Sequence, residues 1–157
     1  MSESTGAGFV LAPDEGRSID LGTFGMSVKA DDTQTGGKFT LLEATEPPGF
    51  GPPLHLHRDA SESFYVTQGE YIVFLDQQEF RCGPGSFVFI PAGTPHGFRV
   101  GAEPSRKLLL FAPAAMVGYF DDLSEAMHAG NLGPDALAAI AAEHAMEVIG
   151  PIPESYA

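Results

Sequence analysis

Between about residue 18 and residue 112, this chain consists of short apolar stretches separated by glycine, proline or small polar residues. The 157-residue chain contains 19 glycines and 13 prolines, which leaves little room for long regular elements in this region. Many short strands joined by tight turns are typical of a β-sandwich or a β-barrel. We therefore expect an all-β fold with strands at 18–24, 26–30, 38–44, 54–57, 62–67, 70–75, 78–82, 86–90, 97–100 and 106–111.

Two turns in this region have the residues expected of β-hairpins, at positions 68–69 and 76–77. Gly69 would supply the positive φ that such a turn requires. The N-terminal segment 1–16 is rich in small residues, so we expect a loose arm there with one short strand at 9–11.

The composition changes after Pro113, and the rest of the chain predicts one or two α-helices. Segment 114–129 can place five apolar side chains on one side of a helix: Met116, Val117, Phe120, Leu123 and Met127. Segment 134–148 is rich in alanine, and Pro134 suits a first helical turn. These helices either cover an apolar face of the barrel or form a lid over its mouth.

The overall composition limits what the chain can bind. A net charge of −13 argues against nucleic acid and against anionic membranes as partners. A single cysteine, Cys82, excludes an intrachain disulfide and a thiolate-rich zinc site. We see no signal peptide and no apolar run of about 20 residues, so we expect a cytoplasmic protein. We expect one domain at 1–157, with the barrel at about 18–112 and a helical extension at about 113–150.

Four side chains predict a metal site. His55 and His57 are two residues apart in one predicted strand, so both imidazoles point to the same face. Glu62 opens the next strand after a short polar loop, and His96 follows a proline- and glycine-containing turn. Three neutral imidazoles and one carboxylate suit a divalent transition metal better than a cation that prefers oxygen ligands alone. We therefore predict one bound Ni, Co, Fe, Mn, Cu or Zn ion.

These stretches resemble the two sequence motifs of the cupin superfamily. The first motif requires a glycine, His-x-His, a glutamate and a second glycine, and it is matched by Gly49, His55, His57, Glu62 and Gly69. The second requires a glycine, Pro-x-Gly, a histidine and an asparagine, and its first four positions are matched by Gly85, Pro91, Gly93 and His96. Val100 replaces the asparagine, which is not usually a metal ligand in this family.

The resemblance implies a six- to eight-stranded double-sheet jelly roll with the metal inside. It also implies a homodimer, which members of the family often form through their N-terminal strands. The sequence segments around the motifs are similar to those of quercetinase-like single-domain cupins, whose characterised members are flavonol 2,4-dioxygenases.

Three functions follow from such a site. The first is a dioxygenase that acts on an aromatic, flavonol-like or enediol-type molecule, with Glu62 as the general base. The second is a metal-dependent isomerase or cyclase for a polyketide-like substrate, which needs no oxygen. The third is a non-catalytic module that binds a small molecule. An apolar substrate pocket is predicted beside the metal, lined by Phe50, Leu54, Phe64, Val66 and Phe98.

Three other reactive residues receive structural interpretations. His128 and His144 lie in the predicted helical tail, without an evident partner, and we interpret both as structural or surface residues. Cys82 ends a strand before a glycine and is interpreted as a small apolar side chain.

Overall fold

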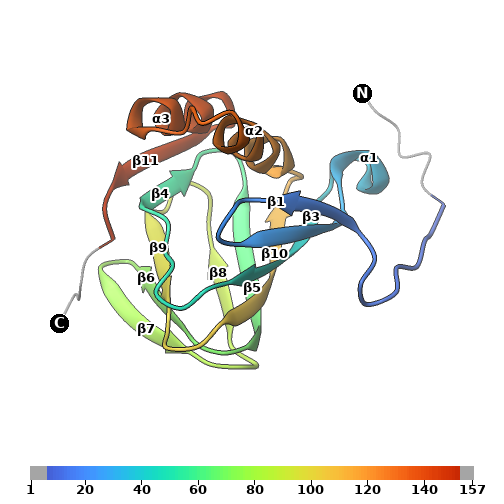
Figure 1. The fold of residues 1–157 in the computed structure, drawn as a ribbon. Coiled ribbons are helices and arrows are strands. Elements are labelled where there is room, and N and C mark those ends of the chain that lie inside the picture. The colour runs from blue at the N-terminus through green and yellow to red at the C-terminus, as the bar shows by residue number, and fades with distance from the viewer. Residues whose placement is uncertain (1–6, 153–157) are drawn as a thin grey trace.

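The computed structural model describes residues 7–152, in which eleven strands and three helices form two sheets with a helical cover (Figure 1). The strands are β1 (Arg17–Asp20), β2 (Gly25–Ala30), β3 (Thr40–Glu46), β4 (Leu54–His57), β5 (Ser61–Gln68), β6 (Tyr71–Leu75), β7 (Gln78–Cys82), β8 (Phe87–Ile90), β9 (His96–Val100), β10 (Ser105–Ala112) and β11 (Met146–Gly150). The helices are α1 (Asp32–Thr35), α2 (Val117–His128) and α3 (Pro134–Glu143). The predicted all-β class with C-terminal helices is confirmed.

The strands are divided between a six-stranded and a five-stranded sheet. The first has the order β1-β2-β3-β10-β5-β8, and the second has the order β11-β4-β9-β6-β7. Neighbouring strands run antiparallel throughout. In β3 and β10 every second side chain is buried, as expected when one face of a sheet meets the core. The apolar core draws on both sheets, and α2 and α3 lie across one end of them (Figure 1).

One of the two predicted hairpin turns is confirmed. Asp76 and Gln77 join β6 to β7 and have φ values of 52° and 60°. The prediction for residues 68–69 was wrong, because β5 and β6 belong to different sheets and do not pair. Gly69 does have a positive φ of 79°, and a Cβ at this position would lie 2.8 Å from Cα of Ser105. The glycine therefore permits a crossing between the sheets at a point of close backbone approach.

The predicted strand at 9–11 is not formed. Phe9 and Val10 are 49% and 91% exposed, and no described strand pairs with them. A short apolar run becomes a strand only where a neighbour accepts its backbone hydrogen bonds. Residues 1–6 and 153–157 of the predicted domain lie outside the described residues, and the dimer stays a prediction. None of the helices within residues 7–152 is long and apolar enough to span a membrane.

The predicted helix at 134–148 was wrong in its last five residues. Helix α3 ends at Glu143, Ala145 turns the backbone with a φ of 55°, and β11 follows. Strand β11 pairs with β4, with Met146 opposite His57. The edge of β4 offered unpaired backbone groups, which the last segment satisfies as a strand. The tail therefore supports the strand that carries two of the candidate metal ligands.

Candidate metal centre

Strands β4 and β9 bring the three histidines together. His55 and His57 alternate with apolar residues on β4, so their rings share the inner face of the sheet. His96 begins β9 and stands directly opposite His55 in the pairing of the two strands. The ring centroids of His55 and His96 are 4.4 Å apart, and those of His57 and His96 are 5.3 Å apart. All three rings are buried.

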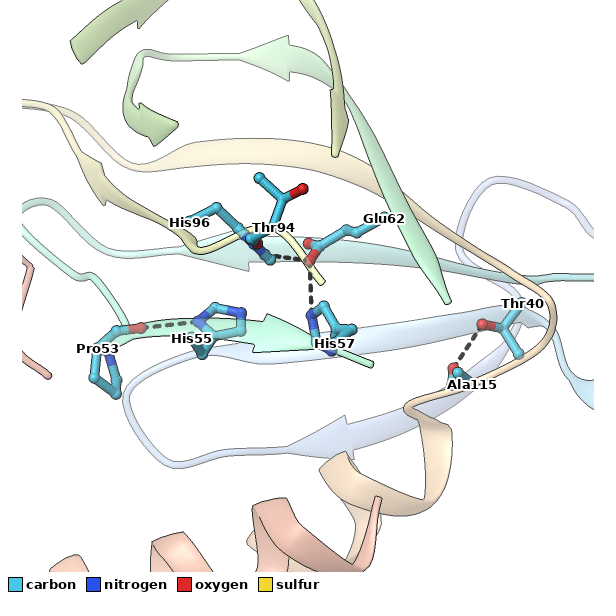
Figure 2. A network of polar contacts seen from close by, with 8 residues as sticks. All are labelled: Thr40, Pro53, His55, His57, Glu62, Thr94, His96 and Ala115. Carbon is cyan, nitrogen blue, oxygen red and sulfur yellow. Dashed lines mark hydrogen bonds and ion pairs between the residues drawn. The ribbon is translucent and has the colours of Figure 1, made fainter. Parts of the chain in front are cut away.

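Glu62 reaches the same point from the opposite sheet. It lies on β5, where its register partners are Ile90 and Phe111. Its Oε1 accepts hydrogen bonds from Nε2 of His57 over 3.0 Å and from Nε2 of His96 over 2.9 Å (Figure 2). The four predicted ligands are therefore assembled from both sheets, which local sequence spacing cannot specify.

Backbone carbonyls orient two of the imidazoles. Nδ1 of His55 donates to the carbonyl of Pro53 over 2.8 Å, and Nδ1 of His96 donates to that of Thr94 over 2.9 Å (Figure 2). A proton held at Nδ1 leaves Nε2 as the nitrogen presented to the cluster, which is how metal-binding histidines are commonly oriented. Among the described residues, Nδ1 of His57 is the one buried side-chain nitrogen or oxygen atom without a hydrogen-bond partner.

The pKa values of the cluster depend on burial and mutual contact. Burial lowers the pKa of His55 to about 4, so this ring is neutral near neutral pH. Burial alone would lower the pKa of His96, but the hydrogen bond and the charge of Glu62 outweigh it and raise that pKa. Burial would raise the pKa of Glu62, yet the hydrogen bonds from His57 and His96 hold it well below its usual value.

These residues fit a metal ion. The donor atoms of His55, His57, Glu62 and His96 all lie within 4.8 Å of one another and are buried. The protons that His57 and His96 direct at Glu62 occupy the place that a cation would take. A cation there would accept the Nε2 lone pairs and balance the charge of the carboxylate, in place of these protons. The cluster could therefore hold one divalent metal, and its donor set does not select one of the six predicted ions.

The cluster forms part of the wall of a cavity of about 260 Å³. This volume lies just below the roughly 300–1,000 Å³ that is typical of ligand pockets, so it suits a compact molecule. Apolar side chains from both sheets and the helices make up most of the wall, among them Phe24, Met26, Leu109, Phe111, Tyr119, Phe120, Leu123 and Leu137. The charged or imidazole side chains in the wall are the four cluster residues, Glu46 and Lys107.

Only some of the predicted pocket residues lie in the cavity wall. Phe50 and Phe98 line the cavity. Phe64 and Val66 are buried in the core, where Phe64 contacts Tyr71, and neither is among the lining residues. Leu54 lines a separate hollow. The alternation of side chains along the strand correctly predicted that Phe64 and Val66 face the interior. The extent of the cavity does not follow from this alternation.

Several residues of the cavity wall were not identified from the sequence. Helix α2 and the residue before it contribute Met116, Tyr119, Phe120 and Leu123, and the helical spacing of three of these was the available signal. Leu137 of α3 also lines the cavity, so both helices take part in its wall. Glu46 and Lys107 carried no such signal, because they are far apart in the sequence and belong to no motif.

The two histidines of the tail do have partners, in contrast to the prediction. Nε2 of His128 donates to Asp20 over 3.2 Å, which ties α2 to the end of β1. His144 donates to Asp122 over 2.6 Å, which ties the end of α3 to α2. Both contacts lie outside the cavity wall, so the structural interpretation of these histidines stays a prediction.

Comparison with known proteins agrees with this geometry. Residues 42–111, which include all four cluster residues, match the family model described as a cupin domain. The chain is 26% identical over 117 residues to a quercetin 2,3-dioxygenase of Bacillus subtilis, a match that covers 74% of this chain and 35% of that protein. The chain therefore spans about a third of the length of this curated relative.

Two solved structures have a similar fold. KdgF from Halomonas sp. has a TM-score of 0.59 at 23% identity, with 65% of this chain and 92% of that chain covered. An RmlC-like cupin from Shewanella frigidimarina has a TM-score of 0.60 at 19% identity, with 69% and 93% covered. These likenesses show the jelly-roll fold that was predicted. Residues 42–111 thus match a cupin domain, the chain has a jelly-roll fold, and it is similar to quercetinase-like cupins.

Proposed function

We propose that this protein is a metal-dependent dioxygenase that acts on an aromatic, flavonol-like or enediol-type small molecule. The observation that carries the proposal is the position of the buried His/Glu cluster in the wall of a cavity that is otherwise mostly apolar and rich in aromatic rings. The similarity to a quercetin 2,3-dioxygenase supports the same class of reaction.

A divalent metal held by His55, His57, Glu62 and His96 would supply a Lewis acid that stabilises the deprotonated substrate. The side chains of this protein have separate tasks. Glu62 is a carboxylate near neutral pH, since its pKa is held low. With an ion bound, the imidazole nitrogens would not donate to Glu62, and its carboxylate could accept the proton of a substrate hydroxyl.

The cavity wall selects and orients the substrate. The ring centroids of Phe50 and Phe98 are 6.1 Å apart, and those of Phe24 and Phe50 are 4.4 Å apart. One side of the cavity is therefore a continuous aromatic surface. A planar ring system gains most from such a surface. The volume of about 260 Å³ limits the substrate to a compact molecule of a few rings. Side chains of α2 and α3 in the cavity wall would limit the access of bulk water to the deprotonated substrate.

The test is an oxygen-uptake assay on protein loaded with one metal at a time and given a panel of flavonols. We expect one dioxygen consumed per substrate lost, and both atoms of labelled dioxygen in the product. Turnover without oxygen uptake would indicate the isomerase or cyclase instead. Tight binding without turnover under every metal would indicate a binding module.

A further inference from the structure

Two charged side chains outside the metal cluster lie in the wall of the same cavity. Lys107 is 0% exposed and Glu46 is 2% exposed. Nζ of Lys107 donates to Oε1 of Glu46 over 2.7 Å, and the hydroxyl of Tyr71 donates to the same oxygen over 2.8 Å. Lys107 is on β10 and Glu46 is on the neighbouring strand β3. We call Glu46 and Lys107 the buried ion pair.

Aromatic rings surround the ammonium group of this pair. Nζ of Lys107 lies 3.4 Å from the ring centroid of Phe98, 4.3 Å from that of Tyr71 and 5.4 Å from that of Phe64. Such rings attract a cation through their electron-rich faces. Phe98 lines the cavity, whereas Tyr71 and Phe64 are not among its lining residues. The ammonium group therefore lies where the aromatic core meets the cavity.

Fold stability alone is a poor explanation for this pair. The inward positions of β3 and β10 are otherwise mostly apolar, as with Leu42 and Leu109. Taking two charges out of water carries a large desolvation penalty, and an apolar pair of similar volume is often equally stable or more so. A charged pair at two such positions therefore favours a role in the cavity.

The buried ion pair and the metal cluster are at different places along the cavity. On β10, Phe111 is the register partner of Glu62, and Lys107 lies four residues earlier on the same face. At about 3.3 Å per residue, this separates the two backbone positions by roughly 13 Å. The cavity therefore has two polar regions whose backbone positions on β10 differ.

We infer that Glu46 and Lys107 form a second polar subsite, which binds a ligand hydroxyl remote from the oxygens that face the metal cluster. Lys107 donates a hydrogen bond to that hydroxyl oxygen, and Glu46 accepts one from its proton. Because both side chains are enclosed, a ligand reaches them only when its apolar body fills the cavity. The ligand is thus a compact aromatic molecule with a chelating oxygen pair at one end and a hydroxyl at the other. This ligand class rests on the proposed function.

The test compares two probes that differ by one remote hydroxyl, 3-hydroxyflavone and 3,4′-dihydroxyflavone. Their dissociation constants are measured by calorimetry without oxygen, on protein loaded with zinc, which is redox-inactive. We expect the wild type to bind the dihydroxy probe about tenfold more tightly, as is typical of a hydrogen bond to a charged group. In the double variant K107M/E46Q, the ratio of the two dissociation constants should fall to about one, while the Kd of 3-hydroxyflavone itself changes by less than about threefold.

Two further variants separate ligand binding from structure. Tyr71→Phe removes a hydrogen bond to Glu46 but does not alter the cavity wall. This variant should therefore keep the preference for the dihydroxy probe over 3-hydroxyflavone. Glu46→Gln keeps an amide oxygen for Tyr71 and removes the charge, so it should lower the preference at least threefold if the double variant does not fold. A preference that survives in K107M/E46Q or in folded E46Q, or that is absent from the wild type, would overturn the inference.

This experiment is independent of the oxygen assay. A lost hydroxyl preference in the variants, with no oxygen uptake by the wild type, would refute the proposed function and support the subsite. Oxygen uptake by the wild type without any preference for the dihydroxy probe would support the proposed function and refute the subsite.

Discussion

The cavity contains two buried polar groups that are built alike and differ in chemistry. In each, one carboxylate oxygen accepts two hydrogen bonds: Glu62 Oε1 from two imidazoles, and Glu46 Oε1 from Lys107 and Tyr71. Imidazoles exchange protons near neutral pH, whereas burial and Glu46 raise the pKa of the Tyr71 phenol, which keeps its proton. The first group can therefore give up protons for a metal ion, whereas the second keeps its protons and can offer a ligand hydrogen bonds alone.

Removing the carboxylate of the metal cluster should have the largest effect. We expect Glu62→Gln to lower turnover by about 10²–10⁴-fold, because the amide cannot accept the substrate proton. Some metal should remain bound by the three histidines. Oxygen uptake and elemental analysis of the purified variant measure the two effects. Unimpaired turnover would remove Glu62 from the role of base.

Breaking the buried ion pair should chiefly affect stability. Lys107→Met leaves Glu46 as an unpaired buried carboxylate, which we expect to cost about 3–5 kcal/mol in the free energy of unfolding. The double variant K107M/E46Q should recover most of this loss, because neither charge is left alone. Urea denaturation of the two variants beside the wild type gives both values. Equal losses in both variants would show that an unpaired buried charge is not the cause of the loss.

The pH dependence of metal binding should separate the two groups. A metal competes with the Nε2 proton of His96, whose pKa is raised. Metal affinity should therefore be low below that pKa, rise up to about tenfold per pH unit through it, and level off above. His55, with a pKa of about 4, is already neutral over this range. Competition of zinc with a chelator between about pH 5 and 8 measures the profile.

The variant K107M/E46Q is the matched control for this profile. This double variant removes one positive and one negative charge and none of the four cluster residues, so its metal affinity should rise over the same pH range as that of the wild type. A flat profile in the wild type would contradict the assignment of His96 as a ligand.

The contact between α2 and β1 should give the smallest effect. The two ring nitrogens of His128 both face acceptors, the carbonyl of Ser124 at 2.7 Å and Asp20 at 3.2 Å, so a protonated ring can donate to both. The hydrogen bond to Ser124, followed by that to Asp20, raises the pKa of His128. The raised pKa means that the contact is fully present below about pH 6.5 and is lost as the pH rises through the folded-state pKa.

Hydrogen exchange of the α2 amides measures this contact. We expect protection to fall by less than about tenfold between pH 6 and pH 8, after correction for intrinsic exchange. His128→Gln should remove that dependence and leave metal affinity unchanged. If the variant retains the same pH dependence, another group in the helix must be responsible.

Local spacing was enough to predict part of the site. His55 and His57 share a face because a strand has a period of two, and this holds wherever the strand lies. The other two ligands, Glu62 and His96, were supported by their place in the cupin motifs. The edge strand β11 was missed, because residues 146–150 become a strand only when the edge of β4 is there to pair with them.

The sequence by itself determined the all-β class, the ligand pair on β4 and the resemblance to cupins. These depend on strand period, turn residues and motif spacing, which are all short-range properties. Only the tertiary structure decided that Glu62 crosses from one sheet to meet His57 and His96 of the other. It alone placed Glu46 beside Lys107, 61 residues later, in the same cavity. Long-range pairing of strands depends on the packing of the whole core, and no local pattern encodes it.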